Sequence, residues 1–228
     1  MSISLERILK VFTDEYISDC YFCLPAVVVG TQNLAENRID VIPLPNRNYQ
    51  DSTIQEYPVL KNVLLATLGY GNAAVIVPIK QGDTVLLVFS QVSIDPFKGG
   101  AVQPYDNFDR RFLDLNDAIA IAGISPFSKS NNNPAIHTYN HSTDDLVVVQ
   151  NIGKSNQSEV RLRDNGDTEL NTTQQIKLNS DTIINADEDV RGTLTADNIK
   201  SRSGASGVFT SLDGRIITVT NGIVTSIL

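Results

Sequence analysis

A repeat of eight residues between positions 160 and 194 is the sequence feature that most restricts how this chain can fold. The middle residue of each repeated segment is polar and the outer two are mostly apolar or small. The segments are Val160-Arg161-Leu162, Thr168-Glu169-Leu170, Ile176-Lys177-Leu178, Ile184-Asn185-Ala186 and Gly192-Thr193-Leu194. Because strand side chains alternate with period two, each segment is predicted to be a short strand with two side chains on one face. Polar turn formers separate the segments, and this regular pattern indicates a β-solenoid.

The length of the repeat predicts how many chains build the solenoid. A triangular coil made by one chain needs roughly 20–25 residues, about three times this period. Three chains that each supply one strand per layer would close the coil and bury the apolar positions on a three-fold axis. We therefore predict a homotrimer with an intertwined β-helix, and an ordinary β-sandwich is the alternative. The predicted trimer core is Val160, Leu162, Leu170, Ile176, Leu178, Ile184 and Leu194.

The charge balance argues against a nucleic-acid partner. The net charge is −8 and the pI is near 4.7, whereas a protein that binds phosphates normally carries a basic face. The sequence has no apolar run of about 20 residues that could span a membrane as a helix. Its first residues lack the basic region and apolar core of a signal peptide, so we expect synthesis in a cytoplasm.

Two cysteines and two histidines have spacings that occur in zinc sites. Cys20 and Cys23 are separated by two residues, and His137 and His141 by three. The interval between the two pairs is far longer than in a compact zinc finger, and the cysteines lead directly into an apolar strand. We interpret the cysteines as small buried apolar residues, and we expect no metal, no cofactor and no disulfide.

The rest of the chain divides into a helix, a barrel, a linker and two β regions. A helix is predicted over residues 3–17, with Ser4 as its cap and Ile8, Leu9, Phe12, Tyr16 and Ile17 as its apolar stripe. Strands at 23–30, 38–44, 57–68, 73–79 and 83–91 predict a small β-barrel, which residues 96–123 close. The predicted domains are the helix and barrel over 1–124, a linker over 125–145, the β-helix over 146–206 and a tip over 207–228.

The tip is predicted to be a three-stranded meander. Strands at 208–212, 215–220 and 223–228 are joined by Asp213-Gly214 and Asn221-Gly222, which favour two-residue type I′ turns. This register places Val208, Leu212, Ile217, Val219, Val224 and Leu228 on one face, and Phe209, Ile216, Ile223 and Ile227 on the other. A lone three-stranded sheet is marginal in water, so the tip should need partner chains. We predict an apolar plug formed by Ile216, Ile217, Val219, Ile223, Val224, Ile227 and Leu228.

The layout resembles the central spike proteins of contractile-tailed bacteriophage baseplates. The similar stretches are Val88-Phe89-Ser90-Gln91, Asp95-Pro96-Phe97, Arg110-Arg111-Phe112, residues 116–123 and the last twenty residues. The resemblance implies an oligosaccharide/oligonucleotide-binding (OB) barrel that joins a trimer to the baseplate hub or tail tube. It also implies a needle at the baseplate tip of the virion that passes transiently through the host outer membrane.

The sequence departs from this family at the tip. Many of its members carry a His-x-His motif there that binds iron, but residues 190–228 contain no histidine. That metal site is therefore not expected. The lysozyme domain inserted in some members is not expected either, since no segment is left to form it.

No catalytic constellation is visible in the sequence, so we expect no enzyme activity. Asp144-Asp145 and Asp187-Glu188-Asp189 fall where turns are expected, and Arg110-Arg111 is interpreted as part of an inter-subunit ion pair. Three functions remain: a mechanical spike, a trimeric tail-fibre-like adhesin that binds a cell-surface glycan, and a polysaccharide-cleaving β-helix enzyme. The last two normally need a side groove with aromatic residues. Residues 146–207 contain none, which favours the spike.

Overall fold

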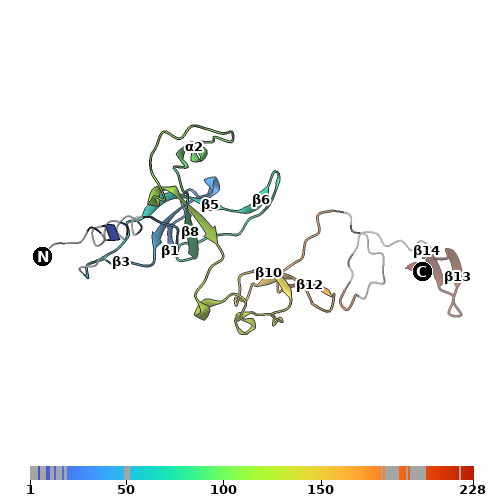
Figure 1. Ribbon diagram of the computed structural model, residues 1–228. Helices are drawn as coiled ribbons and strands as arrows, with labels where there is room; N and C mark the ends of the chain where they lie inside the picture. The colour runs from blue at the N-terminus through green and yellow to red at the C-terminus, as the bar shows by residue number, and fades with distance from the viewer. Residues whose placement is uncertain are drawn as a thin grey trace. The chain divides into compact units, whose positions relative to one another are not determined.

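The computed structural model describes residues 20–48, 52–180, 204–220 and 222–228, together with isolated residues at 5–17 and 182–195 (Figure 1). The chain divides into two units, Met1–Gln174 and Gln175–Leu228. Within the predicted helix, the described residues Leu5, Leu9, Lys10, Thr13 and Ile17 are helical. Its predicted cap and the stripe residues Ile8, Phe12 and Tyr16 lie outside the described residues. No described helix is long and apolar enough to cross a membrane.

The first unit contains a closed barrel of five strands. In barrel order these are β1 (Cys23–Gly30), β2 (Arg38–Pro43), β5 (Leu60–Ala66), β9 (Ala118–Ala122) and β8 (Thr84–Phe89) (Figure 1). All neighbours are antiparallel except β5 and β9, which run parallel. A small five-stranded barrel is the architecture of the OB fold. The prediction of a mainly β chain with an OB-like barrel is confirmed.

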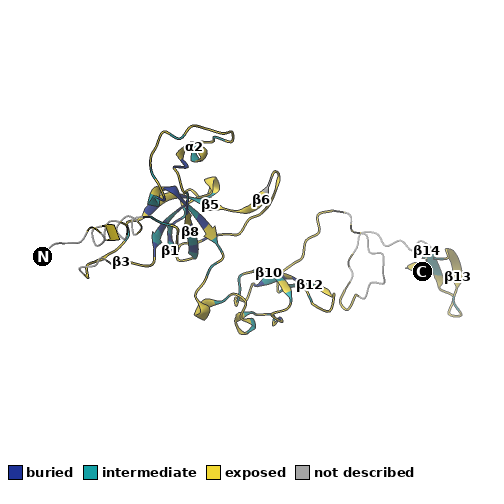
Figure 2. Ribbon diagram, viewed as in Figure 1, coloured by how far each residue is buried: buried dark blue, intermediate teal, exposed yellow. Residues whose placement is uncertain are grey.

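Alternation along the strands fills the barrel. In β1, β2, β8 and β9 every second residue points inward, so one face of each strand is buried and the other is partly open (Figure 2). In β5 an irregularity at Lys61 and Asn62 interrupts this alternation, and both Leu60 and Val63 are buried. The buried core comprises Ala26, Val28, Ile39, Val41, Leu60, Val63, Leu65, Ile79, Val85, Leu87, Phe89, Ala118 and Ala120. On β9 the inward residues are alanines, whose small side chains suit the narrow interior of a five-stranded barrel.

One predicted barrel strand is wrong. Residues 73–79 do not enter the barrel, because β7 (Ala73–Val75) pairs only with β6 (Leu68–Tyr70) in a separate hairpin. The following Ile76 and Val77 are exposed, and only Ile79 reaches the core. Strand β9 occupies the place next to β8 instead. Apolar periodicity alone cannot distinguish a barrel strand from an exposed apolar ribbon.

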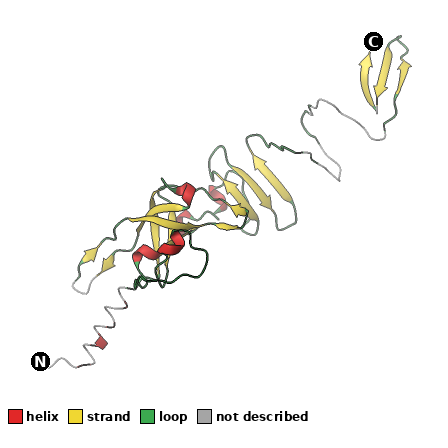
Figure 3. Ribbon diagram, turned by 90° about the horizontal axis from the view of Figure 1, so that it is seen from above, coloured by secondary structure: helices red, strands yellow, loops and turns green. Residues whose placement is uncertain are grey.

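Short helices and a second hairpin lie in the connections between the barrel strands (Figure 3). They are η1 (Leu34–Glu36), β3 (Arg47–Asn48), β4 (Ile54–Gln55), α2 (Asp95–Lys98) and η2 (Leu115–Asp117). Two further turns of 3-10 helix, η3 (Phe127–Lys129) and η4 (Pro134–Ile136), lie in the predicted linker.

Arg111 stabilises the long loop between β8 and β9 through ion pairs. Its guanidinium pairs with Asp95 at the start of α2, with Asp109 at 2.9 Å and with the buried Asp117 at 3.6 Å. Asp117 also accepts a hydrogen bond of 3.0 Å from the Ile94 backbone N–H. The prediction that Arg111 pairs between subunits is therefore wrong, since its acidic partners lie in its own chain. The neighbouring Arg110 is exposed.

The remaining strands form two meanders, each within one chain. Strands β10 (Leu146–Gln150), β11 (Ser158–Leu162) and β12 (Thr168–Thr172) make the first. Strands β13 (Gly207–Thr210), β14 (Ile216–Thr220) and β15 (Ile223–Ile227) make the second, in the C-terminal unit (Figure 1).

The first two repeats of eight residues pair differently from the prediction. Val160 lies opposite Leu170 in an antiparallel hairpin of the same chain, whereas the intertwined helix would pair such strands between chains. Gly166, with φ of +94°, lets the chain reverse, and the Arg163 N–H closes the turn by donating to the Asp167 carbonyl at 2.8 Å. The repeats beyond it are not described as strands. Ile176 and Leu178 are exposed and irregular, and Ile184 and Leu194 lie outside the described residues.

Candidate assembly surfaces

The sheet β10–β12 exposes an apolar face. Residues that lie directly opposite one another in neighbouring strands share a face, and the register places five large aliphatic side chains together. They are Leu146, Val148, Val160, Leu162 and Leu170, and each is between 43% and 65% exposed. Contiguous apolar surface of this kind marks an interaction site on a protein. Three of the predicted trimer-core residues, Val160, Leu162 and Leu170, lie on this face.

The opposite face of the same sheet is polar and buried. Arg161 is 2% exposed, forms an ion pair with Glu159, which is 5% exposed, and lies 3.5 Å from Glu169. Its guanidinium also donates to the backbone carbonyls of Asn140 at 2.9 Å and Tyr139 at 3.3 Å. The segment 137–141 of the same chain therefore covers this face. The middle residues of the repeat were predicted to face outward, but Arg161 is enclosed.

Gln157 connects residues 137–141, which cover the polar face, to the sheet through hydrogen bonds. Its side-chain oxygen accepts hydrogen bonds from the Thr138 and Gly153 backbone N–H groups, both at 2.9 Å, and its amide nitrogen donates to Glu159 at 3.1 Å. Buried polar groups are costly unless they are paired, and these are paired within one chain. The sheet is therefore closed on its polar face and open on its apolar face, the reverse of a sheet in a monomeric protein.

This polar cluster was not predicted from the sequence. The signal was the alternation of Gln157, Glu159 and Arg161 with less polar neighbours, matched across the turn by Glu169 and Asn171. Residues of opposite charge at facing positions of one hairpin indicate that the polar side also packs.

The two histidines lie together, and the two cysteines lie elsewhere. The rings of His137 and His141 meet edge to face with their centres 4.4 Å apart, in the segment that covers the polar face. Cys20 is half-buried before the barrel, and Cys23 starts β1 with an exposed side chain, contrary to the prediction of buried cysteines. Within the described ranges, no three histidine, cysteine, aspartate or glutamate residues converge on one point.

His141 should make stability depend on pH. Burial lowers its pKa below the usual value of about 6.5, and His137 and Arg161 lower it further, against smaller opposing effects of Glu159 and Asp145. The unfolded chain therefore binds a proton at higher pH than the folded chain does. We expect stability to be full above about pH 6.5 and to fall as the pH decreases toward the lower pKa of the folded state.

Thermal melting at pH 7.5 and pH 5.5 measures this effect. The unmodified chain should lose more thermal stability over this interval than a His141→Gln variant. Equal losses in the two proteins would show that His141 is not responsible.

The C-terminal meander differs from its predicted register. Thr210 pairs with Ile216, and the Ser211 N–H donates to the Arg215 carbonyl at 2.8 Å, so the first loop holds three residues and not two. Gly214, with φ of +84°, takes the left-handed position of this longer turn. The second turn is as predicted in length, because Thr220 pairs directly with Ile223, although Asn221 lies outside the described residues.

The changed register separates the tip into an apolar face and a mixed face. Phe209, Ile217, Val219, Val224 and Ile227 now share one side of the sheet. The other side carries Val208, Thr210, Ile216, Thr218, Thr220, Ile223, Ser226 and Leu228. The predicted plug residues are thus divided between the two faces. Most of them are exposed in the single chain, including Ile216, Val224, Ile227 and Leu228.

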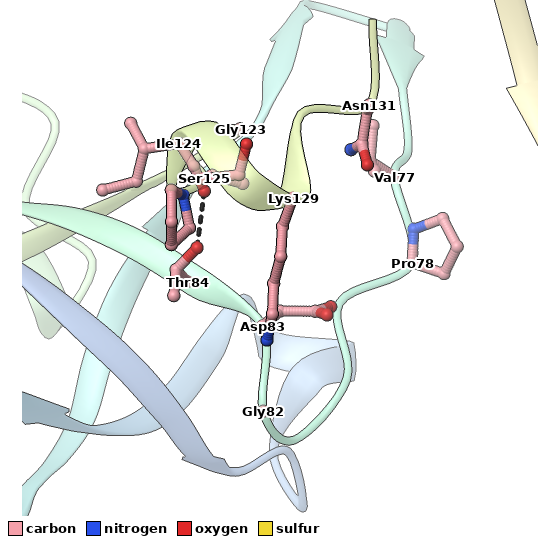
Figure 4. A pocket seen from close by; sticks show the side chains of 12 residues that line it. Val77, Pro78, Gly82, Asp83, Thr84, Gly123, Ile124, Ser125, Lys129 and Asn131 are labelled. Atoms are coloured by element: carbon pink, nitrogen blue, oxygen red, sulfur yellow. Dashed lines mark hydrogen bonds between the residues drawn. The ribbon is translucent and has the colours of Figure 1, made fainter. Parts of the chain in front are cut away.

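A groove lies beside the barrel, where a glycan-binding protein would need aromatic residues in the lining. It has a volume of about 400 Å³ and is lined by the loop before β8, the start of β8 and the chain that follows β9 (Figure 4). The Thr84 hydroxyl donates to the Ile124 carbonyl at 2.5 Å, and Asp83 accepts from the Lys80 N–H at 2.8 Å. None of its twelve lining residues is aromatic, so the groove offers no platform for stacking a sugar ring.

The barrel lies in a segment that matches a known protein family. Residues 24–123 match the phage protein Gp138 N-terminal domain. The match begins in β1 and ends just after β9, so it includes all five barrel strands and the loop that Arg111 fastens. It covers less than half of the 228 residues. A search of curated proteins finds no match.

The family match supports a structural protein of a bacteriophage and a place in the virion. The part of the chain that carries the two meanders lies outside the matched residues.

Proposed function

We propose that this chain is the central spike of a contractile phage tail and that it acts as a homotrimer without catalysing a reaction. The observation that carries the proposal is the sheet β10–β12, whose polar face is closed by its own chain while five aliphatic side chains remain exposed. Covering such a face is the main source of free energy in most obligate assemblies. Two further copies of the chain supply the cover.

The local topology favours a particular kind of trimer. Since β10, β11 and β12 come from one chain, each subunit contributes a whole sheet as one side of a triangular prism. The apolar faces point toward the three-fold axis, and each subunit keeps its polar cluster to itself. This arrangement replaces the intertwined strands predicted for residues 146–172.

The C-terminal meander is the part proposed to enter the membrane. Arg215 is the last charged residue of the chain, and thirteen uncharged residues follow it. Charged side chains are costly inside a bilayer, so the uncharged residues 216–228 lower the cost of entry, whereas Asp213 and Arg215 in the first turn of the meander add to it. The apolar face with Phe209, Ile217 and Ile227 packs against the same face of the other copies, which leaves the mixed face of threonine and aliphatic residues outside.

The barrel is proposed to attach the spike to the baseplate hub or tail tube. The phage family match falls on this part of the chain. The hairpin β6–β7 and the residues after it expose Leu68, Val75, Ile76 and Val77, and residues 62–79 carry no charge. An isolated two-stranded ribbon is marginal in water, so this hairpin suits contact with a neighbouring protein.

Removal of the tip tests the piercing role. We expect phage whose spike lacks residues 207–228 to assemble, because the barrel and the sheet β10–β12 remain, but to lose most of their infectivity. Arg215→Gln is the matched control, since it alters the tip at one exposed position and should leave infectivity intact. Normal infectivity of the truncated particles would contradict the piercing role.

A further inference from the structure

The long loop between β8 and β9 exposes apolar side chains that do not contribute to the barrel core. Its tip, residues 101–108, follows α2 (Figure 1). Within this tip Phe108 is 92% exposed and Val102 is 83% exposed, and Tyr105 lies between them with 40% of its surface exposed. Apolar surface gathered in this way on a folded domain marks an interaction site.

The base of the loop is fixed by contacts within the chain. Phe112 pairs with Val92 in an isolated antiparallel β-bridge. The guanidinium of Arg111 donates to the hydroxyl of Ser93, which is 1% exposed, and the side-chain amide of Asn107 donates to the Ser93 carbonyl at 3.2 Å. A loop that is already ordered loses less conformational entropy when it binds a partner.

The strand register places the loop at one end of the barrel. Strand β8 ends at Phe89, which pairs with Ala118 at the start of β9, so the loop leaves and returns at this end. Cys23, at the start of β1, pairs with Val88 near the same end. The chain that precedes β1 therefore enters the barrel beside the loop.

The rest of the chain leaves the barrel at the opposite end. Val85, near the start of β8, pairs with Ala122, the last residue of β9. Residues 123–228, which include both meanders, continue from that point. The barrel thus has one end that leads to the meanders and another that carries the loop.

We propose that the loop tip inserts Phe108 into an apolar pocket of the baseplate hub or tail tube protein that holds the spike. The proposal rests on the spike function, in which the residues after the barrel lead toward the host and the opposite end of the barrel faces the tail. An aromatic side chain that fills a pocket and loses its water commonly dominates the binding energy of an interface. The tip carries only one charged residue, Asp106, so the surface that receives it is mainly apolar.

Photo-crosslinking in assembled phage tests the proposal. The chain is made with p-benzoylphenylalanine in place of Phe108, or in place of Phe127 as the control, and the purified particles are irradiated. Phe127 is fully exposed and lies in the chain that leaves the other end of the barrel. We expect position 108 to form a covalent product with a second virion protein, identified by mass spectrometry, and position 127 to form no product with that protein.

Replacement of the aromatic ring measures its contribution. Phe108→Ser should leave the mass in solution at about 75 kDa, three times the 24.9 kDa of one chain, because the tip does not join the copies to one another. The amount of the chain in each phage particle should fall by about tenfold or more. Phe127→Ser should leave both quantities unchanged.

Three results would overturn the docking loop. They are the lack of any cross-link at position 108, cross-links there only between copies of the chain, and normal incorporation of the Phe108→Ser variant. The second result would show that the tip packs within the trimer. If the unmodified chain were absent from purified particles, the spike function itself would be contradicted, which distinguishes the two failures.

Discussion

Replacing Arg161 with alanine should destabilise the chain by about 3–5 kcal/mol. The guanidinium is 2% exposed and pairs with Glu159, so its removal leaves a buried carboxylate without its cation. The carbonyls of Tyr139 and Asn140 lose their donor as well. Urea denaturation followed by circular dichroism measures the loss, and hydrogen exchange at β11 and β12 should localise it.

The neighbouring arginine provides a matched control. Arg163 pairs with Glu169 at 2.7 Å but is 39% exposed, so Arg163→Ala should cost no more than about 1 kcal/mol. Glu159→Gln combined with Arg161→Met should recover part of the stability lost in Arg161→Ala, because no buried charge then remains unpaired. Equal effects of the two single alanine variants would show that the polar face is not enclosed.

Placing aspartate at Leu170 should abolish assembly. In the proposed trimer, this change brings three carboxylates together among the aliphatic side chains near the axis, which costs several kcal/mol or more. The mass in solution should fall from about 75 kDa to the 24.9 kDa of one chain. The barrel should stay folded, since its core lies within the chain.

A charge placed away from the apolar face serves as the control. Ser155 lies in the exposed turn between β10 and β11, so Ser155→Asp adds the same charge without meeting the other copies. This variant should keep the mass of the unmodified protein. If Leu170→Asp also kept it, the apolar face would not be the assembly surface.

Most of the barrel was predictable because inward apolar residues alternate with outward residues along its strands, a pattern that is visible in each strand separately. The three strands β1, β2 and β8 carry inward residues such as Val28, Val41 and Leu87 at every second position, and each was found from this pattern. The hairpin β6–β7 was misassigned because its apolar residues match a strand equally well. Only the long-range pairing of β9 with β5 and β8 decides which segment closes the barrel.

The registers of the two meanders were less predictable, since they depend on single glycine conformations. At Gly214 the chain adopts a three-residue loop, which shifts every pair of the first tip hairpin by one position. A shift of one residue moves a side chain to the other face of the sheet. Both loop lengths are compatible with an Asp-Gly sequence, so the local sequence does not choose between them.

The buried polar face could not be found from hydrophobic periodicity. A pattern that assigns apolar residues to the interior places Arg161 and Glu169 outside by construction. The structure encloses Arg161 because the segment around His141 supplies backbone carbonyls for its guanidinium. The sequence of that segment predicts a polar linker. Its contacts with Arg161 join residues about 20 positions apart and form only when the chain folds.

The mass of the unmodified chain in solution tests the central proposal most directly. Light scattering or sedimentation equilibrium at micromolar concentration should give about 75 kDa, three times the 24.9 kDa of one chain. Three apolar sheet faces then cover one another. A mass near 25 kDa would show that the exposed face of β10–β12 does not associate with other copies of the chain. A mass near 50 kDa would replace the trimeric prism with a pair of sheets packed face to face, and either result would contradict the account.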